Sequence, residues 1–134
     1  MAGYSNKPLA QKLGLKPGMR AYFQDAPPGY ADLLGELPEG VEVVEHLDGW
    51  FDFIQVFCTQ ESALVRTFPR LKAALRPTGM LWLSWPKKAA RMPTDLGENR
   101  IRQIGLESGL VDVKVIAVDE RWSGLKFVIR LRDR

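Results

Sequence analysis

Hydrophobic and polar positions follow two periods along this chain, and each period predicts a different kind of element. Short apolar runs at residues 19–23, 41–44, 51–58, 80–85, 111–118 and 125–131 have the length and composition of β-strands. Between residues 60 and 75, apolar side chains recur every three or four positions and predict the longest helix. Shorter helices are predicted at residues 8–13 and 30–36, and from Thr94 or Asp95 to Ser108. This order of elements predicts a three-layer α/β fold, in which helices cover both faces of a mostly parallel sheet of about six strands.

Glycine and proline mark the expected boundaries of these elements. Gly14 and Gly109 follow two of the helices, at the position where a left-handed C-cap favours glycine. Residues 76–79, with the sequence Arg-Pro-Thr-Gly, predict a turn before the fourth strand. Pro69 lies inside the longest helix, where proline costs about 3 kcal/mol. We therefore expect a kink there, or two helical pieces in place of one straight helix.

Two connections decide how the strands are joined. Residues 119–124 form a short link, which predicts that the last two strands pair as an antiparallel hairpin at the edge of the sheet. Residues 45–50 separate the second and third strands and allow two arrangements. Asp48 and Gly49 could form a hairpin turn, or an extended link of about 20 Å could return the chain past a short strand and keep the strands parallel. We favour the parallel arrangement.

Composition narrows the classes of protein to consider. The length of 134 residues, with 46% hydrophobic and 26% charged residues, predicts one globular domain over residues 1–134. The net charge is +3, but basic and acidic residues are interleaved, which argues against nucleic-acid binding. No signal peptide and no apolar stretch of about 18 residues is visible, so we expect a cytoplasmic protein without a membrane span. One cysteine and one histidine exclude the common zinc sites, so we expect no metal.

The strongest candidate site follows the predicted strand 80–85. Ligands of open α/β sheets bind beyond the carboxyl ends of the strands, and this strand delivers Trp85, Lys87 and Lys88 to that edge. The two ammonium groups would hold a phosphate or carboxylate, with the amino end of the next helix beside them. Alternatively, both lysines are solvated loop charges and Asp95 already occupies the helix end.

The expected hairpin returns to the same edge and adds further candidates. Trp122 would offer a stacking surface or cover the edge of the core. Asp119 or Glu120 would form either an acid–base pair or a structural ion pair with Lys87. Asp25 ends the first strand, where it would accept a ligand hydroxyl or begin the turn. The predicted ligand-binding residues are Asp25, Trp85, Lys87, Lys88, Asp119 and Trp122.

Three reactive residue types occur without the context that catalysis needs. Cys58 belongs to an apolar run and is expected to be a buried thiol. Ser84 lacks a flanking Gly-x-Ser-x-Gly motif. His46 could titrate near neutral pH, but a lone histidine in a polar loop is usually an ordinary loop residue without a catalytic role. The catalytic residues, if there are any, are not identified by the sequence.

The segments FDFIQVF and LKAALRPTGMLWLSW, together with the terminal hairpin, resemble the second half of S-adenosylmethionine-dependent methyltransferase domains. This resemblance covers roughly the last 80 residues and implies a Rossmann-like fold, but it includes no catalytic motif. Where that family has a glycine-rich cofactor loop, this chain has QDAPPG at residues 24–29, and its two prolines remove backbone donors. One strand and two helices of that fold also look absent, so the fold resembles a truncated version.

A second resemblance extends over nearly the whole chain. From GYSNKPLAQKLGLKPGMR through PRLKAALRPTGMLWLSWPKK to the terminal hairpin, the sequence resembles the DUF3052 family of uncharacterised bacterial proteins. The resemblance implies a standalone bacterial domain. It implies no activity, because the family itself has none assigned.

These observations lead to three hypotheses about function. The first is a non-catalytic or regulatory domain that binds an anionic small molecule or a protein partner at the strand ends. The alternative is a diverged methyltransferase-like enzyme or nucleotide-cofactor-binding protein, which binds its cofactor between the first and third strands with charge from Lys87 and Asp119. The third is an assembly subunit that buries Trp50, Trp85 or Trp122 against a partner. The cofactor, the ligand and the oligomeric state stay open at this stage.

Overall fold

The computed structural model describes residues 7–134, which form one six-stranded sheet with helices on both faces. The strands are β1 (Arg20–Gln24), β2 (Glu42–Val44), β3 (Phe51–Phe57), β4 (Leu75–Pro86), β5 (Leu110–Ala117) and β6 (Trp122–Ile129). The α-helices are α1 (Leu9–Lys12), α2 (Tyr30–Leu34), α3 (Glu61–Ala73) and α4 (Glu98–Glu107). Short 3₁₀ turns follow at η1 (Lys88–Ala90) and η2 (Leu131–Asp133).

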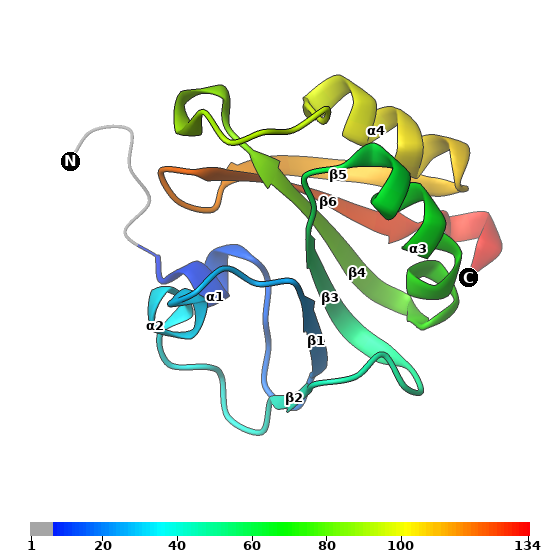
Figure 1. The fold of residues 1–134 in the computed structure, drawn as a ribbon. Helices are drawn as coiled ribbons and strands as arrows, with labels where there is room; N and C mark the ends of the chain where they lie inside the picture. The colour runs from blue at the N-terminus through cyan, green and yellow to red at the C-terminus, as the bar shows by residue number, and fades with distance from the viewer. Residues whose placement is uncertain (1–6) are drawn as a thin grey trace.

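The strand order is β2-β1-β3-β4-β6-β5, and the first four of these strands are parallel to one another. Strand β6 is antiparallel to both β4 and β5, so the last two strands form the hairpin that the sequence predicts (Figure 1). The α/β class, the six strands and the antiparallel hairpin are all confirmed. None of the helices among residues 7–134 has an apolar stretch long enough to cross a bilayer.

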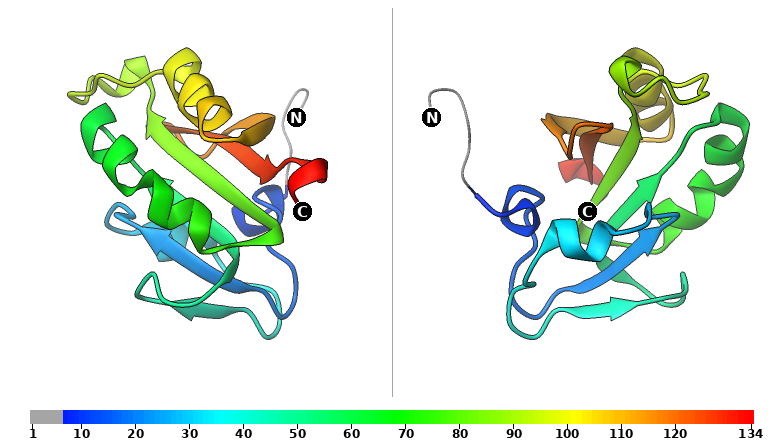
Figure 2. Two further views of the ribbon diagram at one scale, coloured as in Figure 1. Left: turned by 90° about the vertical axis from the view of Figure 1, so that its right-hand side faces the viewer. Right: turned by 60° about the vertical axis from the view of Figure 1, so that its left-hand side comes forward.

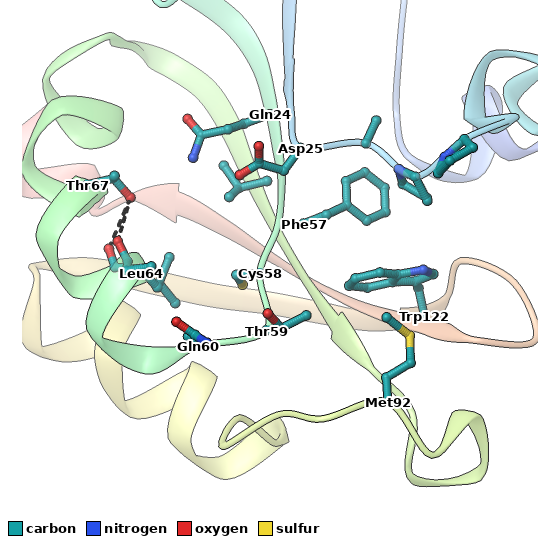
Figure 3. Close-up of a pocket in the computed structure, with 15 residues that line it drawn as sticks. Gln24, Asp25, Phe57, Cys58, Thr59, Gln60, Leu64, Thr67, Met92 and Trp122 are labelled. Atoms are coloured by element: carbon teal, nitrogen blue, oxygen red, sulfur yellow. Dashed lines mark hydrogen bonds between the residues drawn. The ribbon is translucent and has the colours of Figure 1, made fainter.

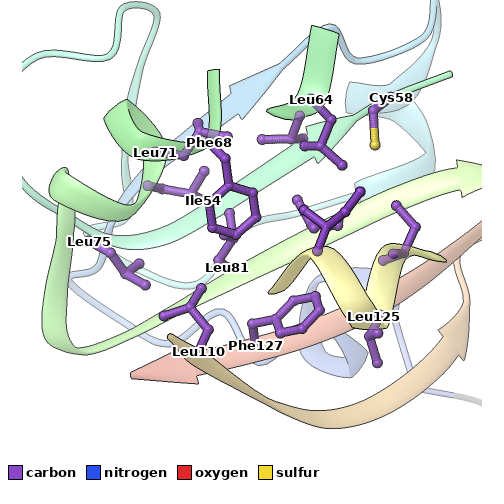
Figure 4. Packing of buried hydrophobic residues seen from close by; sticks show 14 of the residues in the cluster. Ile54, Cys58, Leu64, Phe68, Leu71, Leu75, Leu81, Leu110, Leu125 and Phe127 are labelled. Carbon is purple, nitrogen blue, oxygen red and sulfur yellow. The ribbon is translucent and has the colours of Figure 1, made fainter. Parts of the chain in front are cut away.

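Two buried clusters fill the spaces between the three layers. Helices α3 and α4 cover one face of the sheet, and α1 and α2 lie against the other (Figure 2). Alternate residues of β3 point to opposite faces, so that Ile54 joins the first cluster and Phe53 the second. Figure 4 shows the first cluster, which contains Leu64, Phe68 and Leu71 of α3 and Phe127 of β6. The near-continuous apolar run of β3 is therefore explained by burial on both faces.

The connection from β2 to β3 crosses β1, which lies between these two strands. The register places Val44 level with Tyr22, and Phe51 about three residues below that level. The link must therefore move about 10 Å along the strands and about 10 Å across them, which six extended residues can span. The parallel arrangement is confirmed, and it is possible because β2 is only three residues long.

Residues 76–79 do not form the separate turn that their sequence predicts. They belong to β4, which begins at Leu75, and they form an irregularity in its pairing with β3. Phe51 pairs with Leu75 and Phe53 with Met80, so the extra residues of β4 bulge out of the ladder. A Cβ on Gly79 would lie 3.0 Å from the carbonyl oxygen of Phe51, which explains why the bulge contains glycine.

Helix α3 is one continuous helix despite Pro69, so of the two expected outcomes, a kink or two helical pieces, the second is wrong. Proline removes the hydrogen bond to the carbonyl of the residue four positions earlier, which is Val65. Both residues are exposed, so the hydrogen bond that proline removes lies on the solvent face of the helix. Burial of Leu64, Phe68 and Leu71 on the opposite face stabilises the helix.

The N-cap of α4 is Gly97, so neither Thr94 nor Asp95 has the capping role predicted for it. The Asp95 carboxylate instead accepts a hydrogen bond from the backbone N–H of Glu61, with 2.7 Å between nitrogen and oxygen, at the start of α3. A tertiary contact across 34 residues thus caps a different helix. Gly109 has φ +90° after α4, as the predicted left-handed cap requires.

Candidate functional site

A pocket of about 500 Å³ opens at the carboxyl ends of β1 and β3. These strands are neighbours, but the chain leaves β1 toward β2 at one edge and leaves β3 toward β4 on the other side. Such a switch point is where open α/β sheets bind ligands. The lining residues are Gln24, Asp25, Ala26, Pro27, Pro28, Val56, Phe57, Cys58, Thr59, Gln60, Ala63, Leu64, Thr67, Met92 and Trp122 (Figure 3).

The walls of the pocket come from four separate parts of the chain. Residues 24–28 follow β1, and residues 58–60 follow β3 and lead into α3. Met92 reaches the pocket from the loop between β4 and α4, and Trp122 from the start of β6 (Figure 3). The site therefore depends on the whole sheet and cannot be read from one motif.

The loop that carries Met92 is fastened to the pocket wall by hydrogen bonds. The Thr94 hydroxyl donates to the carbonyl of Thr59, with 2.6 Å between oxygens, and the backbone N–H of Asp95 donates to the same carbonyl at 3.3 Å. The Asp95 carboxylate caps the N–H of Glu61. These bonds hold residues 92–95 against the start of α3.

Asp25 is the one acidic residue among those that line the pocket, and no lysine or arginine lines it. Its backbone has φ +58°, in the left-handed region that aspartate tolerates better than most residues. This conformation turns the chain directly after β1 and leaves Asp25 exposed at the mouth of the pocket. The electrostatic character of the pocket therefore suits a hydroxyl or a positively charged group.

Cys58 also lines the pocket, but its thiol is buried. Burial, assisted by the negative charge of Asp25, raises the pKa of Cys58 to about 12. The thiol donates to the carbonyl of Ser84, with 3.3 Å between sulfur and oxygen. A neutral thiol is a weak nucleophile, so Cys58 lines the pocket without being a nucleophile. Its apolar surroundings in the sequence correctly predict a buried thiol.

A buried polar chain lies under the site and was not predicted from the sequence. The Tyr30 hydroxyl donates to the Gln55 side-chain oxygen, and the Gln55 amide donates to the Ser84 hydroxyl at 3.1 Å. Burial raises the pKa of Tyr30 well above its ordinary value, so the phenol stays protonated. These hydrogen bonds among Tyr30, Gln55 and Ser84 fix α2 to the sheet. The signal in the sequence is Gln55, a polar residue inside an apolar strand.

The two predicted tryptophans are buried and lie on opposite faces of the sheet. Trp85 belongs to the cluster beneath α3 and α4 and does not line the pocket. Trp122 lies on the other face, where its ring meets Phe57 edge-on with 5.1 Å between centroids. Trp122 both covers the core and lines the pocket, so the two interpretations offered for it are compatible.

Lys87 and Lys88 lie beyond the end of β4 but outside the lining of the pocket. The backbone N–H of Lys87 donates to the carbonyl of Arg121 at 2.8 Å, which places the hairpin link beside this loop. The predicted meeting of distant segments at one edge is therefore observed. Among residues 7–134, no ion pair joins Lys87 to Asp119 or Glu120.

Asp119 has a structural role in the hairpin link. Its carboxylate accepts hydrogen bonds from the backbone N–H groups of Arg121 and Trp122 at 2.7 and 2.8 Å. With Trp122 and residues 27–30, it also lines a second cavity of about 410 Å³ beside the first.

His46 is exposed after β2 and lines neither cavity. Within the described part of the chain, no three acidic, cysteine or histidine side chains are grouped as metal ligands would be.

Solved structures of methyltransferases share this fold. A SAM-dependent methyltransferase from Aquifex aeolicus is 18% identical with a TM-score of 0.61, over 90% of this chain and 87% of its own. A complex of DhpI with SAH is 10% identical with a TM-score of 0.63, over 93% and 84%. Magnesium protoporphyrin IX methyltransferase from Synechocystis PCC 6803 with bound SAH is 12% identical with a TM-score of 0.57, over 91% and 78%.

No protein-family model and no curated protein matches the chain. The resemblance to the DUF3052 family therefore stays a prediction. Identities of 10–18% to the three solved structures indicate a common fold and nothing about activity. What the comparisons establish is a mixed α/β, Rossmann-like fold of the kind found in SAM-dependent methyltransferases, as the segments around β3 and β4 suggested.

Proposed function

We propose that this protein is a non-catalytic ligand-binding domain that takes a nucleoside-type molecule between the carboxyl ends of β1 and β3. The observation that carries the proposal is the 500 Å³ pocket at the switch point of the sheet, with Asp25 at its mouth. That volume is within the range of small-molecule sites, which are mostly apolar with a few polar groups.

The chemistry of the lining favours a nucleoside over a nucleotide. Phe57, Leu64 and Trp122 offer apolar surface to a flat base, and the Asp25 carboxylate can accept hydrogen bonds from ribose hydroxyls. Phosphate groups need cations or free backbone N–H groups. The pocket has no lysine or arginine, and Pro27 and Pro28 supply no backbone N–H.

The small number of ionisable groups in the lining favours binding without catalysis. Asp25 and Cys58 are its only ionisable side chains, and the Cys58 thiol is held neutral by burial. Proton transfer near neutral pH usually needs a group with a pKa close to that pH. A regulatory role, in which ligand occupancy changes the behaviour of the domain, fits this lining better than turnover does.

A second candidate is methyl transfer from S-adenosylmethionine. One observation favours it, because solved structures of the same fold include complexes with SAH. S-adenosylmethionine is itself a nucleoside with a positively charged sulfonium group, which suits a pocket whose lining has one carboxylate and no cation. Both candidates thus use the same pocket and differ in whether the methyl group moves.

The test is isothermal titration calorimetry with adenosine, SAH, S-adenosylmethionine and ATP. We expect saturable binding of at least one of the first three ligands and weaker binding of ATP. Asp25→Asn should weaken nucleoside binding about tenfold, the scale of one hydrogen bond to a charged group. Asp32→Asn is the matched control, because Asp32 is an exposed carboxylate on α2 that does not line the pocket.

Two outcomes would contradict the proposal. No binding of any nucleoside would overturn the proposal. Transfer of labelled methyl from S-adenosylmethionine to an acceptor would replace it with the second candidate. The anionic ligand or protein partner first expected at Lys87 and Lys88 is a separate hypothesis, and alanine variants of these lysines would test it, since neither residue lines the pocket.

A further inference from the structure

Lysines from the last two strands meet on the face of the sheet that carries α1. Lys114 of β5 lies directly opposite Lys126 of β6, and Lys126 lies directly opposite Trp82 of β4. Side chains of directly opposite residues point to the same face of a sheet. Trp82 belongs to the buried cluster on the α1 side, so both lysines project on that side.

A third lysine approaches from the segment after α1. The indole N–H of Trp82 donates to the carbonyl of Leu13 at 2.9 Å, and Lys12 donates to the carbonyl of Ala117 at 3.3 Å. These contacts hold the end of α1 against β4 and β5. Lys16 lies three residues after Leu13, whose carbonyl meets Trp82, the residue directly opposite Lys126. Burial lowers the pKa of Lys126, and the charges of Lys114 and Lys16 lower it further.

No acidic side chain compensates these charges. Within residues 7–134, none of Lys16, Lys114 and Lys126 has a carboxylate within ion-pair distance. Like charges directly opposite one another destabilise a pair of strands, and Lys126 is also half-buried. The arrangement therefore costs stability in the free protein, and an anion at this point would remove that cost.

We propose that Lys16, Lys114 and Lys126 form a binding site for a small multivalent anion of the phosphate class. Lysine ammonium groups bind phosphate as compact point charges with three donors each. The three residues come from three segments to one face of the sheet, whereas a nucleic-acid surface needs cations spread along a groove or stripe. The site lies apart from the pocket between β1 and β3, and none of its lysines lines that pocket.

Calorimetric titration with pyrophosphate at constant ionic strength tests this site. We expect saturable binding by the wild-type protein and at least a tenfold loss of affinity in Lys126→Met and in Lys114→Gln. Arg66→Gln is the matched control, because it removes one positive charge from an exposed position on α3 and should bind as the wild type does. Without pyrophosphate, Lys126→Met should raise the thermal midpoint, since it removes the repulsion.

The exposed position of Lys114 keeps the test decisive even if Lys126→Met does not fold. Pyrophosphate binding equal in Lys114→Gln and the wild type would overturn the proposal. So would a wild-type protein that shows no binding beyond that of chloride. Binding of single-stranded RNA without binding of pyrophosphate would overturn it too, and would indicate a nucleic-acid surface instead.

Discussion

The Cys58 thiol lies at the carboxyl end of β3, beside a pocket where a reactive cysteine would meet a bound ligand. Its surroundings decide its chemistry, because burial raises its pKa from an ordinary value of 9.0 to about 12. In the unfolded chain the thiol loses its proton near the ordinary value. The folded state therefore holds an extra proton between these two values, and the stability that this provides is lost as pH rises through that window.

We expect the stability of the wild type to fall between pH 9 and pH 12, with Cys58 contributing at most about 1.4 kcal/mol per pH unit. Chemical denaturation at several pH values measures this slope. Cys58→Ala is the control, because it retains Tyr30, whose raised pKa acts in the same direction. Equal slopes in the two proteins would contradict the prediction, as would rapid labelling of the native thiol at pH 8.

At the scale of residues, the sequence predicts burial better than it predicts partners. The apolar run around Cys58 correctly indicates a buried thiol, because local hydrophobicity largely decides burial. Trp85 and Trp122 look equivalent in the sequence, yet only Trp122 lines the pocket. Which face of a strand a side chain takes depends on pairing with distant strands, and the run of apolar residues in β4 carries no alternation to reveal it.

Helix α3 depends on a cap from outside its own segment. The side chain of its N-cap residue, Gln60, makes no capping hydrogen bond, and the Asp95 carboxylate supplies one to Glu61 instead. We expect Asp95→Ala to lower the free energy of unfolding by about 0.5–2 kcal/mol, the usual range for a lost cap. Urea denaturation measures the change.

Asp95→Asn distinguishes the hydrogen bond from the charge. The amide oxygen of asparagine can still accept from the N–H of Glu61, and asparagine and aspartate are comparable as caps. Most of the stability should therefore return in this variant. If both variants unfold at the same urea concentration as the wild type, the contact contributes nothing to the helix.

At the scale of elements, the sequence predicts which helices and strands exist, but it misplaces some of their boundaries. The apolar period of three to four residues correctly indicates α3, and the short apolar runs correctly indicate all six strands. The sequence misplaces the start of β4, because residues 76–79 have the composition of a turn and form a bulge. It also misassigns Asp95, since proximity in sequence favoured α4 and the tertiary fold brings the residue to α3.

The sheet is unequally supported from its centre to its edge. Strands β3 and β4 each pair on both sides and lie between two buried clusters. Strand β2 is three residues long, pairs only with β1 and is largely exposed. The free energy of local opening should therefore rise from β2 toward β3 and β4.

Hydrogen–deuterium exchange of the native protein measures this gradient. We expect the backbone amides of β3 and β4 to exchange slowest and those of β2 to be among the fastest-exchanging strand amides. Equal protection of β2 and β3 would contradict this expectation. It would indicate that the crossing link after β2, held by hydrogen bonds from Arg20, stabilises the edge more than pairing does.

At the scale of the whole molecule, alternating strands and helices predict the layers, and strand lengths decide the remaining topology. The parallel link between β2 and β3 follows from a three-residue strand that a short connection can pass. The edge of the sheet on which the pocket opens was predictable, because parallel strands share one carboxyl edge. The sequence favoured the end of β4 on that edge, whereas the pocket lies between β1 and β3. The lining of the pocket was not predictable, because Met92 and Trp122 enter it from segments whose positions depend on the complete fold.

The bonds that Thr94 and Asp95 make to the start of α3 have a consequence for what the pocket can admit. Met92 lies two residues before Thr94, so these bonds join the side of the cavity that Met92 forms to the side at the start of α3. A ligand that fits beneath Met92 leaves these hydrogen bonds intact. A larger ligand has to break the hydrogen bonds of Thr94 and Asp95 and open the first turn of α3. Hydrogen bonds outside the cavity therefore limit the size of the ligand that the pocket admits.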